Sequence, residues 1–259
     1  MNIVVAVVLG AIVGGILGVV EHAIWSKASP RMRRVGHVAI VLLTLGTVGG
    51  LVNSGLAGSI ATRLTGSQSS KSAQQSPQEA FGNRVLSDPQ LTAVFQGMTA
   101  DEARLKGSEL SSKGIARLDD ATLARRAQLL ALILNKVSEP TCAAIARGNA
   151  TASQQQELLD TIDGLSASDQ TAWYNISFAA VKAEVAQTPA PSLDSTSIAG
   201  VLDAAKSNMS AADSSAVTAT LGGTATDAQA CVGVKALYHQ ATTMSSSQGQ
   251  VLTRALATS

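Results

Sequence analysis

The segment 119–137, DDATLARRAQLLALILNKV, carries the clearest helical pattern of the chain and indicates how its C-terminal part folds. Its apolar residues recur at helical spacing, at Leu123, Ala127, Leu130, Leu134 and Val137. Further apolar residues, Leu129, Leu132 and Ile133, widen this face until the helix is apolar on nearly every side. We therefore predict that this segment is the central buried helix of an all-α domain.

Two more apolar faces have the same spacing. One comprises Tyr174, Phe178, Val181 and Val185, next to Trp173, and the other comprises Cys231, Val234, Tyr238 and Ala241. No segment shows sustained alternation of β-branched and polar residues, so no strand is expected.

Helix starts and stops alternate along the same region. Side chains that can satisfy the free N–H groups of a first turn are followed by acidic residues at capping-box spacing. The predicted starts are Ser76 with Glu79, Thr99 with Glu102, Ser166 with Asp169, and either Asp119 or Asp120. Gly148 and Gly164 are predicted to end helices.

The chain has two cysteines, and both are predicted to point into the helical domain. Cys142 shares a face with Ile145 on a short helix that starts near Pro140, and Cys231 lies on the last apolar face. In an oxidising compartment such a pair predicts a disulfide, whereas in the cytosol it predicts two buried thiols. Neither cysteine lies in a C-x-x-C motif or beside a histidine, so we expect no metal and no cofactor at this pair.

The N-terminal part, 1–62, has the pattern of a transmembrane hairpin. Two uncharged apolar runs, about 2–20 and 38–60, approach the roughly 20 residues that cross a bilayer. They flank a loop, 21–37, that is rich in basic residues. A cleaved signal peptide is the alternative for the first run, but its N-terminus has no Lys or Arg, which such a peptide requires.

Four basic residues in the loop determine the predicted topology: Lys27, Arg31, Arg33 and Arg34. Because Lys and Arg are retained on the cytoplasmic side, the loop is predicted inside and both flanks outside. Residues after about 62 are then in the periplasm of a bacterial inner-membrane protein; the bacterial assignment rests on the Ala-rich composition. A Ser- and Gln-rich stretch, 63–78, is predicted to be a flexible linker to the helical domain, 79–259.

Small residues recur every fourth position in both predicted spans and would allow close helix packing in lipid. These residues are Ala6, Gly10, Gly14 and Gly18 in the first span, and Gly46, Gly50, Ser54 and Gly58 in the second. The two spans pack on each other in one interpretation. In the other, the small residues mediate self-association of several copies.

A break at 188–191, TPAP, separates the apolar faces of the domain into two groups. The stretch that follows, 192–220, has few large apolar residues. It predicts either a mobile subregion or a pair of Ala-packed helices.

Composition and motifs narrow the class of function. The net charge is +1 with 14% charged residues, so the basic face of a nucleic-acid-binding protein is not expected. No nucleotide-binding, zinc-protease or serine-hydrolase motif occurs, and the acidic pairs at 101–102 and 119–120 lie where helices start.

We expect a membrane-anchored envelope protein whose helical periplasmic domain binds a protein partner or has a structural role, without catalysis. The alternative is an oligomeric membrane assembly, a pore or secretion-channel component, built from the hairpin. A third class is an enzyme whose site assembles from scattered residues, and its mark would be a concave pocket with converging ionisable groups.

Overall fold

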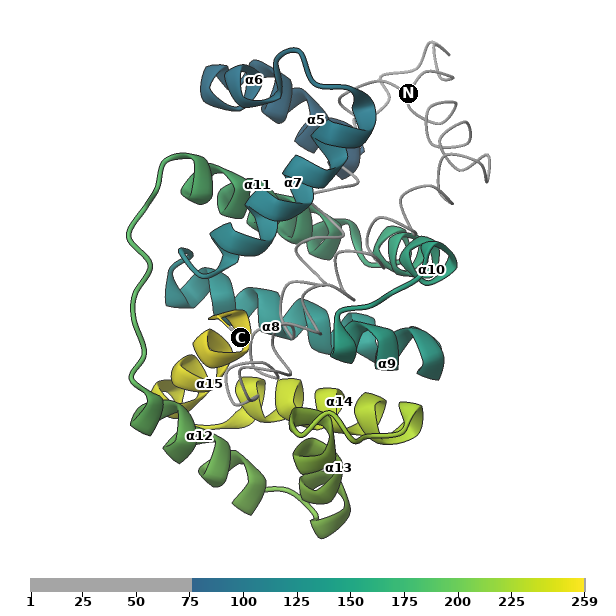
Figure 1. Ribbon diagram of the computed structural model, residues 1–259, viewed down its shortest axis with the longest axis vertical. Coiled ribbons are helices and arrows are strands. Elements are labelled where there is room, and N and C mark those ends of the chain that lie inside the picture. The colour runs from purple at the N-terminus through teal and green to yellow at the C-terminus, as the bar shows by residue number, and fades with distance from the viewer. Residues whose placement is uncertain (1–75, 259) are drawn as a thin grey trace, which may run out of the picture.

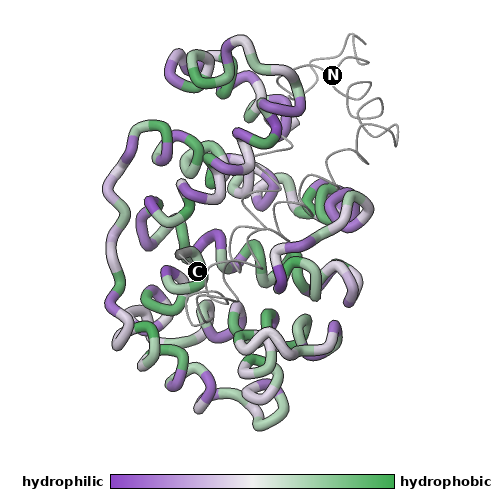
Figure 2. The backbone as a smooth tube through the Cα atoms, in the orientation of Figure 1, coloured by the Kyte–Doolittle hydropathy of each residue, from purple (hydrophilic) through white to green (hydrophobic). Residues whose placement is uncertain are grey.

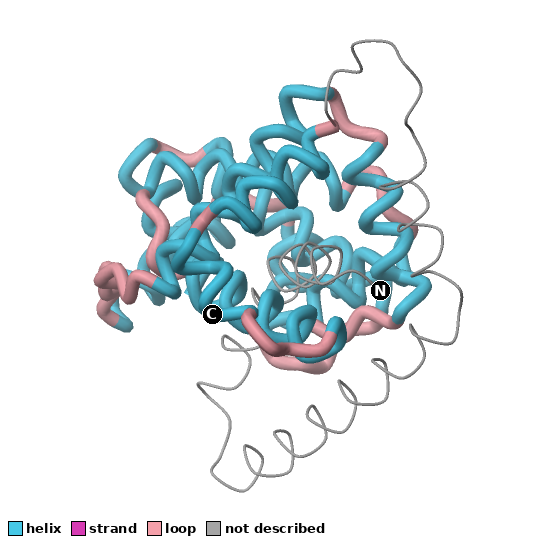
Figure 3. Tube along the Cα trace, turned by 90° about the horizontal axis from the view of Figure 1, so that it is seen from above, coloured by secondary structure: helices cyan, strands magenta, loops and turns pink. Residues whose placement is uncertain are grey.

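The computed structural model describes residues 76–258, which form eleven α-helices and no strand. Figure 1 labels these helices, and Figure 3 shows that they are joined by loops. The first group along the chain is α5 (Pro77–Ser87), α6 (Pro89–Phe95), α7 (Ala100–Ile115), α8 (Asp120–Leu134), α9 (Glu139–Arg147) and α10 (Ala152–Asp163). The second is α11 (Ala167–Val185), α12 (Ser195–Ser207), α13 (Ala211–Leu221), α14 (Asp227–Thr243) and α15 (Ser246–Thr258). The all-α prediction is confirmed for this part of the chain.

The predicted helix starts are found where the capping residues stand. Ser76 and Thr99 each form a capping box with the glutamate three residues on. At the start of α8 the cap is Asp119, whose carboxylate accepts from the backbone N–H of Thr122 at 2.8 Å. Gly148 ends α9 in the left-handed conformation, with φ of 68°.

Helix α8 lies at the centre of the domain, as its sequence predicts. It packs against α11 on one side and against α14 and α15 on the other. Leu123, Ala127 and Leu130 are each 1% exposed, and Leu134 is fully buried. The expectation that α8 is apolar on nearly every side needs one correction, because Leu132 is 42% exposed while Arg126 is only 4% exposed.

The helices before the TPAP break form one side of the core. Helix α11 packs along α7 and α5, and Phe81 of α5 meets Tyr174 and Phe178 of α11 with ring centroids 5.8 and 6.3 Å apart. Figure 2 shows hydrophobic and hydrophilic residues intermingled along these helices, as expected where one face of a helix is buried and the other is solvated.

The helices after the break are assembled around α14, which packs against α13, α9, α8 and α15. The stretch 192–220 contains α12 and nearly all of α13, which confirms the prediction of a pair of helices rather than that of a mobile subregion. Helix α12 packs mainly on α15 and α13 mainly on α14, through small buried residues such as Ala205 and Ala216.

The predicted hairpin and most of the predicted linker lie outside the described residues. The first described helix, α5, begins at Pro77, so the last two residues of the stretch 63–78 are helical. Among residues 76–258, no helix combines the length and the apolar character that a bilayer crossing requires.

Helices α7 and α11 cross most closely at Gly114. A Cβ atom at this position would lie 1.8 Å from the backbone oxygen of Ala180. Backbone cannot move aside as a flexible side chain can, so the crossing requires glycine here.

We expect Gly114→Ala to lower the free energy of unfolding by about 3 kcal/mol or more, because the two helices must separate. The matched control is Gly200→Ala in α12, where nothing lies within 4 Å of the added methyl group. The control removes an exposed helical glycine and should stabilise the protein by up to about 1 kcal/mol. Urea unfolding of the full chain in detergent, followed by tryptophan fluorescence, compares the two; equal stability of both variants would contradict the close crossing.

Candidate functional site

The most constrained place in the domain is the disulfide between Cys142 of α9 and Cys231 of α14. The predicted bond is therefore present, with the two Cα atoms 5.1 Å apart. Cys142 is fully buried and Cys231 is 5% exposed, so the sulfur atoms belong to the core. A bond that closes a loop of 89 residues stabilises the fold by about 4 to 5 kcal/mol in the chain-entropy model.

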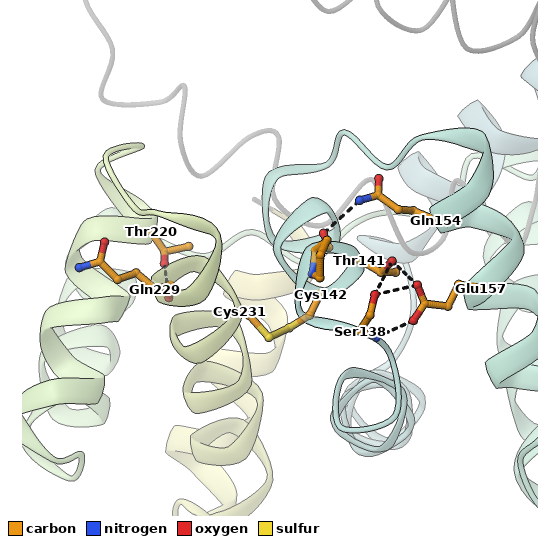
Figure 4. The surroundings of a disulfide bond; sticks show 9 residues. Ser138, Thr141, Cys142, Gln154, Glu157, Thr220, Gln229 and Cys231 are labelled. Atoms are coloured by element: carbon orange, nitrogen blue, oxygen red, sulfur yellow. Dashed lines mark hydrogen bonds between the residues drawn. A yellow bond between two sulfur atoms is a disulfide. The ribbon is translucent and has the colours of Figure 1, made fainter.

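The first turn of α9, beside Cys142, is held by a side chain from α10. Glu157 accepts hydrogen bonds from the backbone N–H of Ser138 at 2.5 Å and from its hydroxyl at 2.9 Å, and also from the hydroxyl of Thr141. Gln154, also on α10, donates to the carbonyl of Pro140 at 3.1 Å. Figure 4 shows these bonds converging on one side of the disulfide. Glu157 thus accepts from the backbone N–H of the N-cap residue Ser138, as the glutamate of a capping box does, although it comes from another helix and the Ser138 side chain makes no cap hydrogen bond of its own.

These hydrogen bonds govern the ionisation of Glu157. Partial burial acts to raise the pKa of its carboxyl, but the bonds donated by Thr141 and Ser138 outweigh it and hold the pKa below its ordinary value. The carboxylate is therefore ionised at neutral pH and acts as a fixed acceptor.

The other partner of the disulfide, α14, is fixed on its far side by α13. Thr220 donates to the carbonyl of Ala216 at 2.7 Å, and its hydroxyl lies where a Cβ at Gly233 would approach to 2.5 Å. Glycine at 233 therefore lets α13 and α14 cross closely, which holds Cys231 in place.

A hollow of about 370 Å³ lies between α5 and α11. Phe81 and Tyr174 contribute buried aromatic rings, and Arg84 and Asn175 contribute exposed polar groups. Arg84 donates to the side-chain oxygen of Asn175 and lies 4.1 Å from the ring centroid of Phe178. The arginine is thus held in place by neighbours on the same wall, and the hollow contains no carboxylate among its lining residues.

Several arginines that the sequence patterns did not single out connect distant segments. Arg254 of α15 is 5% exposed and donates to the Asp120 carboxylate at 2.9 Å and to the carbonyl of Leu118 at 3.0 Å. Arg117 donates to Glu184 at the end of α11 at 2.5 Å. Of the acidic pair 119–120, one member is therefore a cap and the other is an ion-pair partner.

Buried Arg126 is the third of these arginines. It lies on α8 against the Tyr238 hydroxyl of α14, and burial lowers the pKa of its guanidinium. Burial likewise raises the pKa of Tyr238, and the neighbouring positive charge opposes that shift. The signal that could have found Arg126 is its position on the face of Leu123 and Leu130, three residues after the first and four before the second.

The remaining predicted site residues fall outside the described part of the chain. These are the topology-determining residues Lys27, Arg31, Arg33 and Arg34, and the membrane-packing residues Gly10, Gly14, Gly18, Gly46, Gly50, Ser54 and Gly58. Within residues 76–258, no group of three or more His, Cys, Asp or Glu side chains is arranged to hold a metal ion. His239 is exposed on α14.

Comparison with known proteins gives no relative: no family model, no curated protein and no solved structure matches the chain. The fold and the disulfide define residues 76–258 as an all-α, disulfide-linked domain.

We expect Glu157→Gln to lower the free energy of unfolding by about 1 kcal/mol at about pH 7, because α9 loses a charged cap. The pKa of Glu157 is lowered by folding, so its contribution is present above the unfolded pKa of about 4.3 and is lost as pH falls through the folded pKa. The difference from wild type should therefore shrink between about pH 7 and about pH 3 in urea unfolding.

The matched control for this prediction is Glu139→Gln, which neutralises an exposed carboxylate in the same first turn of α9. It should cost only a few tenths of a kcal/mol through the helix dipole. An equal cost for both variants would contradict the role given to Glu157.

Proposed function

We propose that this protein is a membrane-anchored component of a bacterial envelope whose helical domain lies in the periplasm and binds a protein partner without catalysis. The single observation that carries the proposal is the buried disulfide between Cys142 and Cys231. Disulfides form and persist in oxidising compartments and are rare in the cytosol. The compartment they favour is the one that the basic loop 21–37 predicts for the residues after the second apolar run.

The arrangement of carboxylates supports a non-catalytic role. Several of them form hydrogen bonds at helix starts or with basic side chains, and these bonds hold their pKa values below the ordinary range. The capping carboxylates with lowered pKa are Asp88, Glu102, Asp119, Asp169 and Asp194. A general acid or base needs a pKa near the working pH, which is the opposite shift.

Exposed apolar side chains of the domain mark positions at which a protein partner could bind. Large apolar residues that are more than 40% exposed are Leu86, Leu105, Leu132 and Val232. They come from α5, α7, α8 and α14, and together they sample several faces of the bundle.

The test is site-specific photo-crosslinking of the full chain in its native membrane, with a photoreactive phenylalanine placed in turn at each of these four positions. We expect adducts whose mass exceeds the protein by that of a second, different protein. These adducts should persist in Gly14→Leu and Gly50→Leu variants, because the proposal assigns partner binding to the helical domain rather than to the hairpin.

The alternative of an oligomeric membrane assembly gives a different result. Adducts would have the mass of two or more copies of this chain, and the two glycine variants would abolish them. Either that outcome or the absence of adducts at all four exposed positions would overturn the proposed partner-binding role.

A further inference from the structure

A small internal cavity lies where α7, α8 and α11 meet. Its volume is about 10 Å³, and residues from all three helices line it. Those on which the inference rests are Ser111 of α7, Arg126 of α8, and Trp173 and Ser177 of α11. Each of these side chains is at most 5% exposed, so the cavity belongs to the interior of the domain.

Two residues that line this cavity each have a buried polar atom without a hydrogen-bond partner in the protein. These atoms are the hydroxyl oxygen of Ser111, a residue that is fully buried, and the indole nitrogen of Trp173, a residue that is 2% exposed. A buried polar group without a partner is unfavourable, and internal water commonly satisfies such groups. Both atoms therefore point to a small polar ligand.

The neighbouring polar groups cannot substitute for that ligand. The hydroxyl of Ser177 donates to the carbonyl of Trp173 at 3.0 Å, so its proton is already engaged within α11. Arg126, on the same cavity wall, contacts the Tyr238 hydroxyl and carries only donors. A donor cannot satisfy the indole N–H, which is itself a donor.

We propose that this cavity is a binding site for one water molecule. The water accepts a hydrogen bond from the Trp173 indole N–H and forms a second hydrogen bond with the Ser111 hydroxyl. A single water needs about 10 to 15 Å³ and two to four polar partners, and the cavity offers both. A halide ion would also accept from the indole, but it is larger than water and cannot donate to the oxygen of Ser111.

The position of this site gives the water a structural role. Ile115 and Ala180 also line the cavity, and Ala180 is the residue that α7 approaches at Gly114. The water therefore joins α7 to α11 immediately beside their closest crossing. It provides hydrogen-bond partners for two buried polar groups where α7, α8 and α11 meet.

The test uses the indole N–H of Trp173 as the reporter. The chain has two tryptophans, so ¹⁵N-labelled full-length protein in detergent gives two indole signals, and Trp25→Phe assigns them. We expect a direct cross-relaxation peak between the Trp173 indole proton and water, with the sign of a long-lived contact. Its absence in the wild-type protein would overturn the proposal without recourse to any core variant.

Two variants at Ser111 distinguish bound water from other sources of the peak. Ser111→Ala removes one of the two polar partners of the water but leaves the space, so the peak should weaken. Ser111→Val fills the space with methyl groups, so the peak should be lost while the indole signal stays dispersed. The control Ser112→Val makes the same change on a neighbouring, half-buried position of α7 and should retain the peak.

An unchanged peak in Ser111→Ala would show that Ser111 does not bind the water, and retention of the peak in a folded Ser111→Val protein would place the water elsewhere. Each result would overturn the site. Titration with bromide tests the halide. A saturable shift of the Trp173 indole signal would show that the cavity binds an anion rather than water. The absence of a shift would support the assignment to water.

Discussion

The bond between Cys142 and Cys231 is the constraint on which the architecture of this domain depends. It joins α9, from the helices before the TPAP break, to α14, around which the helices after the break assemble. Each partner helix is held on its other side as well, α9 by Glu157 of α10 and α14 by the close crossing with α13. The covalent link therefore fixes two packed halves against the central helix α8.

Charged residues complete this arrangement by joining segments that are distant in the sequence. Arg254 attaches the C-terminal helix α15 to the start of α8, and Arg117 attaches the end of α7 to the end of α11. Hydrogen bonds to buried or half-buried charged groups are stronger than those between neutral groups, so these few contacts matter in a domain with few charges.

Much of this fold could be predicted from local sequence, because caps and apolar faces act over three to seven residues. Asp119, the face from Leu123 to Leu134 and the inward position of Cys231 all follow from such spacing. The pairing of Arg254 with Asp120 spans 134 residues, and that of Glu157 with Ser138 spans 19, so no local pattern reveals either. The sequence wrongly predicts Leu132 to be in the core, because apolarity alone does not show which side of α8 faces solvent.

The proposed function rests on the compartment in which this domain folds, and the redox state of the two cysteines in living cells tests it directly. Cells are quenched in acid, denatured and treated with a maleimide polymer, with and without prior reduction. Our account predicts that the full chain gains mass only after reduction, by two labels, because Cys142 and Cys231 are joined. Two labels without reductant would show free thiols in the cell and would contradict both the periplasmic location and the proposed role.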